Sequence, residues 1–306
     1  MISTRRKTMK KGYFLALLFA SILAAGCGNT EDKKESEDMN KAPLTDVAEE
    51  NVPIPEGYSL FWHDEFNGDK LNTSVWSKEI HKPGFVNHEL QEYTVSPENI
   101  FVKDGCLTIK AIKTVDENGK VHYTSGRLNT NYAMMFTYGK VVVGAKVPKG
   151  KGLWPAAWMM PCSNANYGQW PLGGEIDIME ILGNDTKTAY STIHYGLPHE
   201  QQQGIKRTAA GEPDYSEAFH EFSVEWEPGE IRFYIDGTHI CTANEWFTKN
   251  YNQVPAPFPA PFDKDFHMIL NLAVGGDWPG NPDETTDFDK AEYLVDYVRV
   301  YQKKEQ

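Results

Sequence analysis

The sequence predicts an all-β fold, either a sandwich or a barrel, for most of its 306 residues. Short apolar or alternating segments, rich in Val, Ile, Phe and Tyr, recur along the chain from Ile54 onward. Gly, Pro, Asn and Asp separate these segments, which is typical of strands joined by turns. No long stretch has the 3.6-residue periodicity of an amphipathic helix. These observations together favour β structure throughout the body of the protein.

Eight segments are expected to form strands. Pro228 and Gly229 separate two of them and predict a hairpin turn. No internal repeat of about 20–50 residues is evident, which argues against a solenoid or a propeller. In chain order the expected strands cover residues 59–66, 106–112, 139–147, 174–182, 220–227, 231–237, 267–274 and 293–301.

The composition excludes some classes of partner. The formal net charge is −13 at pH 7, whereas a nucleic-acid-binding protein needs a basic surface. The same charge argues against peripheral binding to anionic lipid and fits an enzyme that acts on a neutral polymer. The chain contains eight Trp. They fit a large β core, and they also fit a cleft in which sugar rings stack on indoles, so composition leaves both readings open.

The N-terminus has the features of an export signal. Five basic residues precede an apolar run at 13–25, which is too short to span a bilayer. The run ends in LAAGC, which resembles a lipobox, so we expect residues 1–26 to be a lipoprotein signal peptide and Cys27 to carry lipid. The alternative is an ordinary signal peptide with an incidental Cys. The basic residues are Arg5, Arg6, Lys7, Lys10 and Lys11.

Residues 27–53 are expected to form a flexible acidic tether, because they are charged, poor in aromatics and contain the run EDKKESED. An acidic segment behind a lipidated Cys resembles the surface-export signal of Bacteroidetes lipoproteins. We therefore expect a membrane attachment through Cys27 and display on the outer surface of the outer membrane. Residues 54–306 then form the functional domain.

Three further cysteines, Cys106, Cys162 and Cys241, show no metal-binding spacing. One disulfide among them is possible, and its partners cannot be assigned from the sequence.

The segment WPLGGEIDIMEILG at 170–183 contains the candidate catalytic residues. Side chains alternate along a strand, so Glu175 and Asp177 share one face. Strict alternation would turn Glu180 into the core, which is costly for a charged group. A β-bulge at or near Met179 resolves this conflict and predicts three carboxylic acids on one face.

Three acids on one strand face are explained better by a catalytic role than by a structural one. A retaining glycosidase needs two carboxyl groups that flank the scissile bond, one as nucleophile and one as proton donor. Like charges that lie close together raise the pKa of one carboxyl group, and that group stays protonated. The alternative is a solvent-exposed strand face, but this does not explain the adjacent Gly173–Gly174 and Trp170.

GEIDIME resembles the active-site signature of glycoside hydrolase family 16, and similar strings cover about residues 58–302. The resemblance implies a concanavalin-A-like β-jelly roll with an open substrate cleft. It assigns Glu175 as nucleophile, Asp177 as helper acid and Glu180 as general acid/base. The inserted Met179 resembles the bulged form of the motif, which is found in laminarinases and related endoglucanases.

The other strings imply residues that bind the substrate. NHELQEYT resembles the family's NNELQYYT, GLWPAAWMMP resembles GxWPAFWML, and NLAVGGDWPG resembles the laminarinase-type NLAVGGNWPG. PGFVNHE departs from the family in carrying Phe85 where Trp is frequent. A structural role competes for His194 and a core role for Trp158. The implied substrate-binding residues are Asn87, Glu89, Arg127, Trp154, Trp158, Trp170, His194, Asn271 and Trp278.

Many family members carry a structural calcium, and the resemblance points to Glu65, the Gly105 carbonyl and Asp296 as its oxygen ligands. No cofactor is expected for catalysis. The sequence therefore predicts a monomeric, retaining endo-β-glucanase that cleaves β-1,3- or mixed β-1,3/1,4-glucan. The alternatives are a non-catalytic glycan-binding lipoprotein of the same fold, or a related enzyme that acts on another polysaccharide such as a galactan.

Overall fold

The computed structural model describes residues 52–250 and 252–304. The signal peptide, Cys27 and nearly all of the predicted tether lie outside these residues. No helix within 52–250 or 252–304 is long and apolar enough to cross a membrane.

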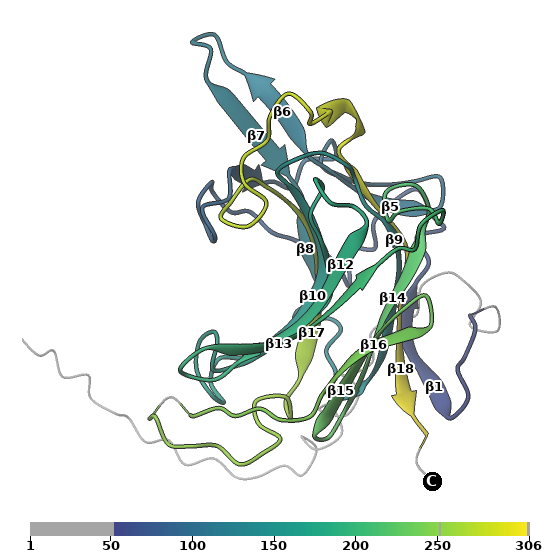
Figure 1. The fold of residues 1–306 in the computed structure, drawn as a ribbon, viewed down its shortest axis with the longest axis vertical. Helices are drawn as coiled ribbons and strands as arrows, with labels where there is room; N and C mark the ends of the chain where they lie inside the picture. The colour runs from purple at the N-terminus through teal and green to yellow at the C-terminus, as the bar shows by residue number, and fades with distance from the viewer. Residues whose placement is uncertain (1–51, 251, 305–306) are drawn as a thin grey trace, which may run out of the picture. The chain divides into compact units, whose positions relative to one another are not determined.

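Two large antiparallel sheets face each other (Figure 1). The eight-stranded sheet has the order β16-β15-β14-β9-β18-β5-β4, with β1 paired to β18. Its strands are β16 (Thr238–Ala243), β15 (Glu230–Ile235), β14 (His220–Glu227), β9 (Gly139–Lys146), β18 (Glu292–Lys303), β5 (Cys106–Lys110), β4 (Ile100–Lys103) and β1 (Tyr58–Asp64).

The seven-stranded sheet carries the functional residues and has the order β13-β12-β11-β10-β17-β8-β2. Its strands bend visibly in Figure 1. They are β13 (Glu200–Arg207), β12 (Thr188–Tyr195), β11 (Glu175–Ile181), β10 (Leu153–Pro161), β17 (Phe266–Val274), β8 (Arg127–Asn129) and β2 (Ser77–Lys78).

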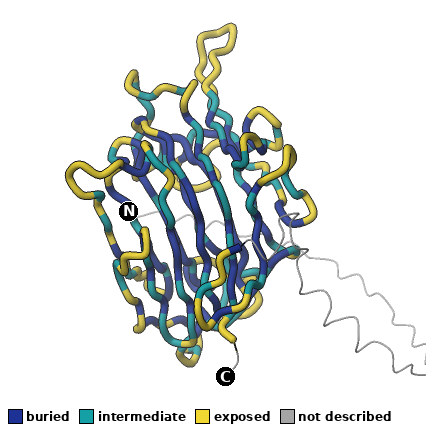
Figure 2. The backbone as a smooth tube through the Cα atoms, turned by 90° about the vertical axis from the view of Figure 1, so that its right-hand side faces the viewer, coloured by how far each residue is buried: buried dark blue, intermediate teal, exposed yellow. Residues whose placement is uncertain are grey.

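A small third sheet projects from one end of the sandwich (Figures 1 and 2). Its hairpin is steadied by the ring of Tyr123, which lies 5.3 Å from that of Phe288. The sheet contains β3 (Gln91–Tyr93), β7 (Val121–Ser125) and β6 (Ile112–Val115), and Phe288 begins the 3-10 helix η2 (Phe288–Lys290).

The all-β sandwich predicted from the sequence is confirmed, and all eight expected segments contain strands. The hairpin at Pro228–Gly229 is also confirmed, since Glu227 pairs with Glu230 across it. The expected single strand at 106–112 was wrong. β5 ends at Lys110, the amide of Ala111 donates to the carbonyl of Ala291, and the chain then enters β6 in the third sheet.

The core lies between the two large sheets. In Figure 2 the buried residues run along the strands, whereas the exposed residues gather in the turns and loops. Every residue of β17 is buried, as expected for a central strand. Trp62, Trp76 and Trp226 are almost completely buried there. Burying a large apolar side chain contributes about 1.5–3 kcal/mol, so these aromatic residues are a major source of stability.

The packed body begins slightly before its predicted start. Val52 is buried in a small cluster with Tyr58, Val142 and Tyr301. The hydroxyl of Tyr301 donates to the carbonyl of Pro53 at 2.8 Å. At least two residues assigned to the tether therefore pack on the outer side of the sandwich.

The three described cysteines are free thiols. Burial raises the pKa of Cys162 to about 12 and that of Cys241 to about 11. Neither thiol is therefore set up as a nucleophile.

Candidate active site

The exposed face of the seven-stranded sheet carries a cleft of about 400 Å³. Its walls come from β8, β10, β11, β12, β13 and β17 and from four loops. All three predicted catalytic acids and all nine predicted substrate-binding residues line it. The cleft thus brings together residues that are spread over nearly 200 positions of the sequence, from Asn87 to Trp278.

The β-bulge predicted in the acidic strand is confirmed. Asp177 pairs with Thr192 and Glu180 pairs with Tyr190, so β11 has one more residue than β12 between these pairs. Ile178 and Met179 are both fully buried. The bulge is fixed by Ser191, whose hydroxyl donates to the Ile178 carbonyl at 2.8 Å.

The three acids share one environment. Asp177 is buried, whereas Glu175 and Glu180 are partly exposed to the cleft. Burial raises the pKa of Glu175, and the charge of Asp177 raises it further. Burial and the charge of Glu180 likewise raise the pKa of Asp177. At neutral pH the cluster therefore retains at least one proton.

Glu180 is placed to exchange a proton near neutral pH. Burial, followed by the charge of Glu175, raises its pKa to about 7. The indole of Trp154 donates to Glu180 Oε1 at 3.1 Å, and this bond together with the charge of His194 opposes the rise. A carboxyl group with a pKa near the working pH suits a general acid/base.

An aromatic cluster stands beside Glu180. The ring of Trp278 lies 5.3 Å from that of Trp154 and 5.0 Å from that of Tyr190, both edge-on. Trp278 remains 39% exposed. This cluster offers an apolar surface on which a sugar ring can stack next to Glu180.

Trp158 and its neighbours are tied into the sheet. The indole of Trp158 donates to Asn271 Oδ1 at 2.7 Å, and the guanidinium of Arg127 lies 4.8 Å from the Trp158 ring. Arg127 is in turn held by Glu79, which accepts from its Nε at 2.9 Å. Trp158 therefore both lines the cleft and supports it.

Asn87 and Glu89 lie in a loop that is fixed against the loop of Trp278. The side chain of Asn87 donates to Glu89, and the carbonyl of Asn87 accepts from the amide of Asp277 at 2.9 Å. A Cβ at Gly276 would lie only 2.9 Å from that carbonyl, and Gly276 has φ +111°. This contact explains why glycine stands there. Nearby, Phe85 is half exposed and stacks on His81 at 3.8 Å.

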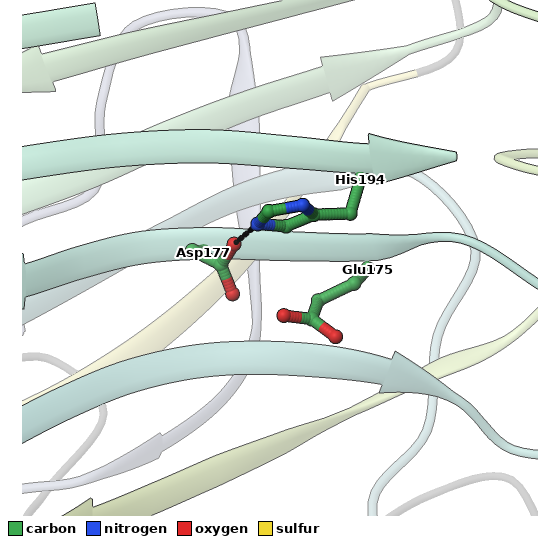
Figure 3. Close-up of side chains that lie close together, drawn as sticks. All are labelled: Glu175, Asp177 and His194. Atoms are coloured by element: carbon green, nitrogen blue, oxygen red, sulfur yellow. Dashed lines mark ion pairs between the residues drawn. The ribbon is translucent and has the colours of Figure 1, made fainter. Parts of the chain in front are cut away.

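Trp170 and His194 form the opposite part of the cleft. Trp170 is 49% exposed, and its ring lies 6.2 Å from that of His194. His194 Nε2 lies 3.2 Å from Asp177 Oδ2, and Figure 3 shows this ion pair beside Glu175. The His194 ring therefore contacts the acid cluster directly.

The sequence analysis missed several cleft residues. Gln201 and Gln203 share the cleft face of β13, but the polar string EQQQ lacks the apolar alternation that marks a strand in a sequence. His199 follows β12 in a loop, where no local pattern marks it. The missed lining residues are Val86, Ala156, His199, Gln201, Gln203 and Ala273.

The residues expected to bind calcium lie on the other sheet. Glu65 follows β1, Gly105 lies in the β4–β5 turn, and Asp296 sits at an irregularity in the pairing of β18 with β9. Burial and the charge of Glu65 raise the pKa of Asp296. Both carboxylate oxygens of Glu65 accept from Arg299, at 2.8 and 2.7 Å, so Arg299 would compete with an ion for Glu65.

Fold and site together define a glycoside hydrolase: a β-sandwich whose open, aromatic-lined cleft has carboxylic acids with raised pKa values on its floor. Residues 87–299 match the model of the glycosyl hydrolases family 16, and the chain belongs to this family.

Known proteins resemble most of the chain. It is 37% identical over 289 residues to the glucan endo-1,3-beta-glucosidase A1 of Niallia circulans, with 89% of this chain and 41% of that protein covered. It is 32% identical over 303 residues to the keratan-sulfate endo-1,4-beta-galactosidase of Sphingobacterium multivorum, with 97% and 68% covered. The endo-beta-1,3-glucanase of Pyrococcus furiosus superposes with a TM-score of 0.70 at 38% identity, covering 83% of this chain and 98% of that one.

Proposed function

We propose that the protein is a retaining endo-β-glucanase that hydrolyses β-1,3- or mixed β-1,3/1,4-glucan. The observation that carries the proposal is Glu180, whose pKa is raised to about 7 on the face of β11 that also bears Glu175 and Asp177. Similarity to the Niallia circulans and Pyrococcus furiosus enzymes supports glucan as the substrate.

In the proposed first step, ionised Glu175 attacks the anomeric carbon while Glu180 gives its proton to the leaving glycosidic oxygen. A covalent glycosyl-enzyme forms and the leaving chain departs as an alcohol. Asp177, buried beside Glu175, holds the nucleophile by a shared hydrogen bond. In the second step Glu180, now ionised, removes a proton from water, the water attacks the anomeric carbon, and Glu175 is released.

The cleft supplies contacts of the kind that a β-glucan needs. Exposed faces of Trp170 and Trp278 lie at two separate positions along it. Gln201, Gln203 and Asn87 add polar groups to its lining. We propose that several glucosyl units bind across these contacts, so that cleavage occurs within the chain and releases oligosaccharides.

The decisive experiment incubates the enzyme with laminarin, barley β-glucan, lichenan, carboxymethyl cellulose and keratan sulfate and sizes the products. We expect oligosaccharides from one of the first three, with the β-anomer seen first in NMR spectra of fresh product. Glu175→Gln should remove this hydrolysis while circular dichroism stays unchanged. Full activity in Glu175→Gln, or release of monosaccharide alone, would contradict the proposal.

A galactan substrate is the second candidate, favoured by the match to the Sphingobacterium multivorum protein over 97% of this chain. Keratan sulfate in the panel tests it directly. A sulfated polymer would favour a basic cleft, whereas Arg127, a cation that lines the cleft, is already paired with Glu79. Glucan therefore remains the first choice.

We also propose that Cys27 is lipidated and anchors a monomeric enzyme to the outside of the outer membrane. The lipobox-like string LAAGC supports the anchor, and the acidic run behind Cys27 supports surface display. Cells that express the full chain should incorporate an alkyne fatty acid into it, and Cys27→Ala should abolish this label. A label that persists in Cys27→Ala would refute the anchor.

Surface display and the monomeric state need separate tests. Added protease should remove the enzyme from intact cells, and light scattering of residues 54–306 should give the mass of a monomer.

A structural calcium near Asp296 is a further proposal. Gly105 and Asp296 would supply oxygen ligands, joined by Glu65 if its carboxylate turns away from Arg299. Calcium added after dialysis against a chelator should raise the melting temperature, and Asp296→Asn should reduce that rise. A melting temperature that does not change when calcium is added would exclude the site.

A further inference from the structure

His199 contacts the catalytic centre through a second histidine. Its Nε2 lies 2.9 Å from His194 Nδ1, and the planes of the two rings differ by 21° with centroids 5.2 Å apart. The other ring nitrogen of His194 lies 3.2 Å from Asp177 (Figure 3). His199, His194 and Asp177 thus form a continuous chain of polar contacts that ends at the acid cluster.

The chain of contacts restricts where the hydrogens can lie. A nitrogen–nitrogen hydrogen bond needs one ring to donate and the other to accept. Burial, followed by the positive charge of His194, lowers the pKa of His199. His199 is therefore favoured as the neutral acceptor. His194 can then donate from Nδ1 to His199, while its Nε2 faces Asp177 Oδ2 at 3.2 Å.

A charged His194 acts on the acids that face it. Its positive charge lowers the pKa of both Glu175 and Glu180. The groups around it are Asp177, Glu175 and Glu180 from β11, His199 from the loop after β12, and the neutral Gln201 opposite it on β13. Among these groups, His199 lies against the ring nitrogen that points away from the acids.

We propose that His199 is a positioning residue of this catalytic centre: by accepting from His194 Nδ1, it holds the His194 ring and its second N–H against Asp177. The inference rests on the proposed hydrolase function and adds a residue to that site. Trp170 completes the arrangement, because its ring lies 4.8 Å from that of His199.

The test replaces His199 by Phe, which keeps a ring beside Trp170 and His194 but removes the acceptor. We expect kcat to fall roughly tenfold, the scale of one hydrogen bond to a charged group. The acidic limb of the kcat/KM profile should move up by about half a pH unit. The limb should move to higher pH because Glu175 must be ionised to attack, and a less charged His194 would lower the pKa of Glu175 less. KM should change less than about twofold.

His199→Gln is the matched variant, because its amide oxygen can accept in place of the imidazole. It should recover most of the lost kcat and the original acidic limb. A wild-type profile in His199→Phe would overturn the inference, and so would an equal loss in both variants. A rise in KM alone would also overturn it, because His199 would then act only through Trp170.

A readout without substrate separates this inference from the proposed function. NMR spectra of the His194 imidazole should show a hydrogen-bonded Nδ1 proton in the wild type and in His199→Gln but not in His199→Phe. If the wild type hydrolyses none of the polysaccharides but this signal is lost in His199→Phe as expected, the proposed function fails and the contact stands. A signal that is unchanged in His199→Phe overturns the inference whatever the activity.

Discussion

At the scale of single residues, the contact between Trp154 and Glu180 controls when Glu180 carries the proton that the proposed mechanism needs. The indole donates to the carboxylate and thereby stabilises its ionised form. Burial and the charge of Glu175 act in the opposite sense and are larger, because the pKa is still raised to about 7. The pH range of the enzyme is thus a balance between opposed local effects.

Trp154→Phe should move the basic limb of kcat/KM to higher pH by about half a pH unit or more, because the carboxylate of Glu180 loses its donor. The measurement is the pH dependence of hydrolysis of the best polysaccharide. Trp278→Phe is the matched control, since its ring belongs to the same cluster. A basic limb that shifts equally in both variants would show that the indole bond has no specific effect.

The two glutamates should respond differently to an activated aryl glycoside, which leaves without a proton. Glu180→Gln should release the aryl alcohol in a burst and then stall, because the glycosyl-enzyme lacks its general base. Glu175→Gln should show no burst at all. Stopped-flow absorbance measures both. A burst in Glu175→Gln and none in Glu180→Gln would exchange the two assigned roles.

At the scale of elements, the bulge in β11 decides which residues face the cleft. Ile178 and Met179 lie side by side in the core, and the alternation resumes with Glu180 on the cleft face. Because side chains alternate with a period of two, adding one residue directly after the bulge would reverse the face of everything that follows on the strand.

Insertion of one Ala between Met179 and Glu180 should therefore turn Glu180 into the core, abolish activity and lower the free energy of unfolding by roughly 3 kcal/mol or more. Met179→Ala keeps the register and leaves only a cavity, at about 2–5 kcal/mol. Denaturant unfolding and kcat per folded molecule distinguish the two. The assigned register would be contradicted if the insertion variant kept kcat, or if Met179→Ala lost kcat while folded.

At the scale of the whole molecule, the ionised form of Glu180 lowers the stability of the fold that holds it. The folded-state pKa of Glu180 is about 7, above its ordinary 4.5. A group with a raised folded pKa contributes fully below its unfolded pKa, and its contribution is lost as pH rises through the folded pKa. The fold is therefore expected to lose stability between about pH 4.5 and pH 7 on account of this group.

Glu180→Gln should raise the free energy of unfolding by about 1 kcal/mol at pH 8 and leave it unchanged at pH 4.5. Partial exposure to the cleft keeps the gain below the full value of the pKa shift. Urea unfolding at the two pH values measures it. An equal gain at both pH values would mean that the charge of Glu180 does not cause it.

Much of the site could be predicted because its residues lie in short strings with strong local rules. The parity of GEIDIME required a bulge, since the alternative was a buried charge at Glu180. The eight Trp were harder to assign. Four of them line the cleft, at 154, 158, 170 and 278, while Trp62, Trp76, Trp226 and Trp246 are buried in the core. Composition could not separate these groups, because an indole suits either environment.

The sequence by itself determined the strands, the bulge and the face on which Glu175, Asp177 and Glu180 lie, because these depend on side-chain alternation within a few residues. Only the tertiary structure decided that His199 reaches His194, that Arg127 pairs with Glu79, and that Gln201 and Gln203 line the cleft. These contacts depend on which strands and loops become neighbours, and that order is set by long-range packing of the sheets rather than by any local pattern.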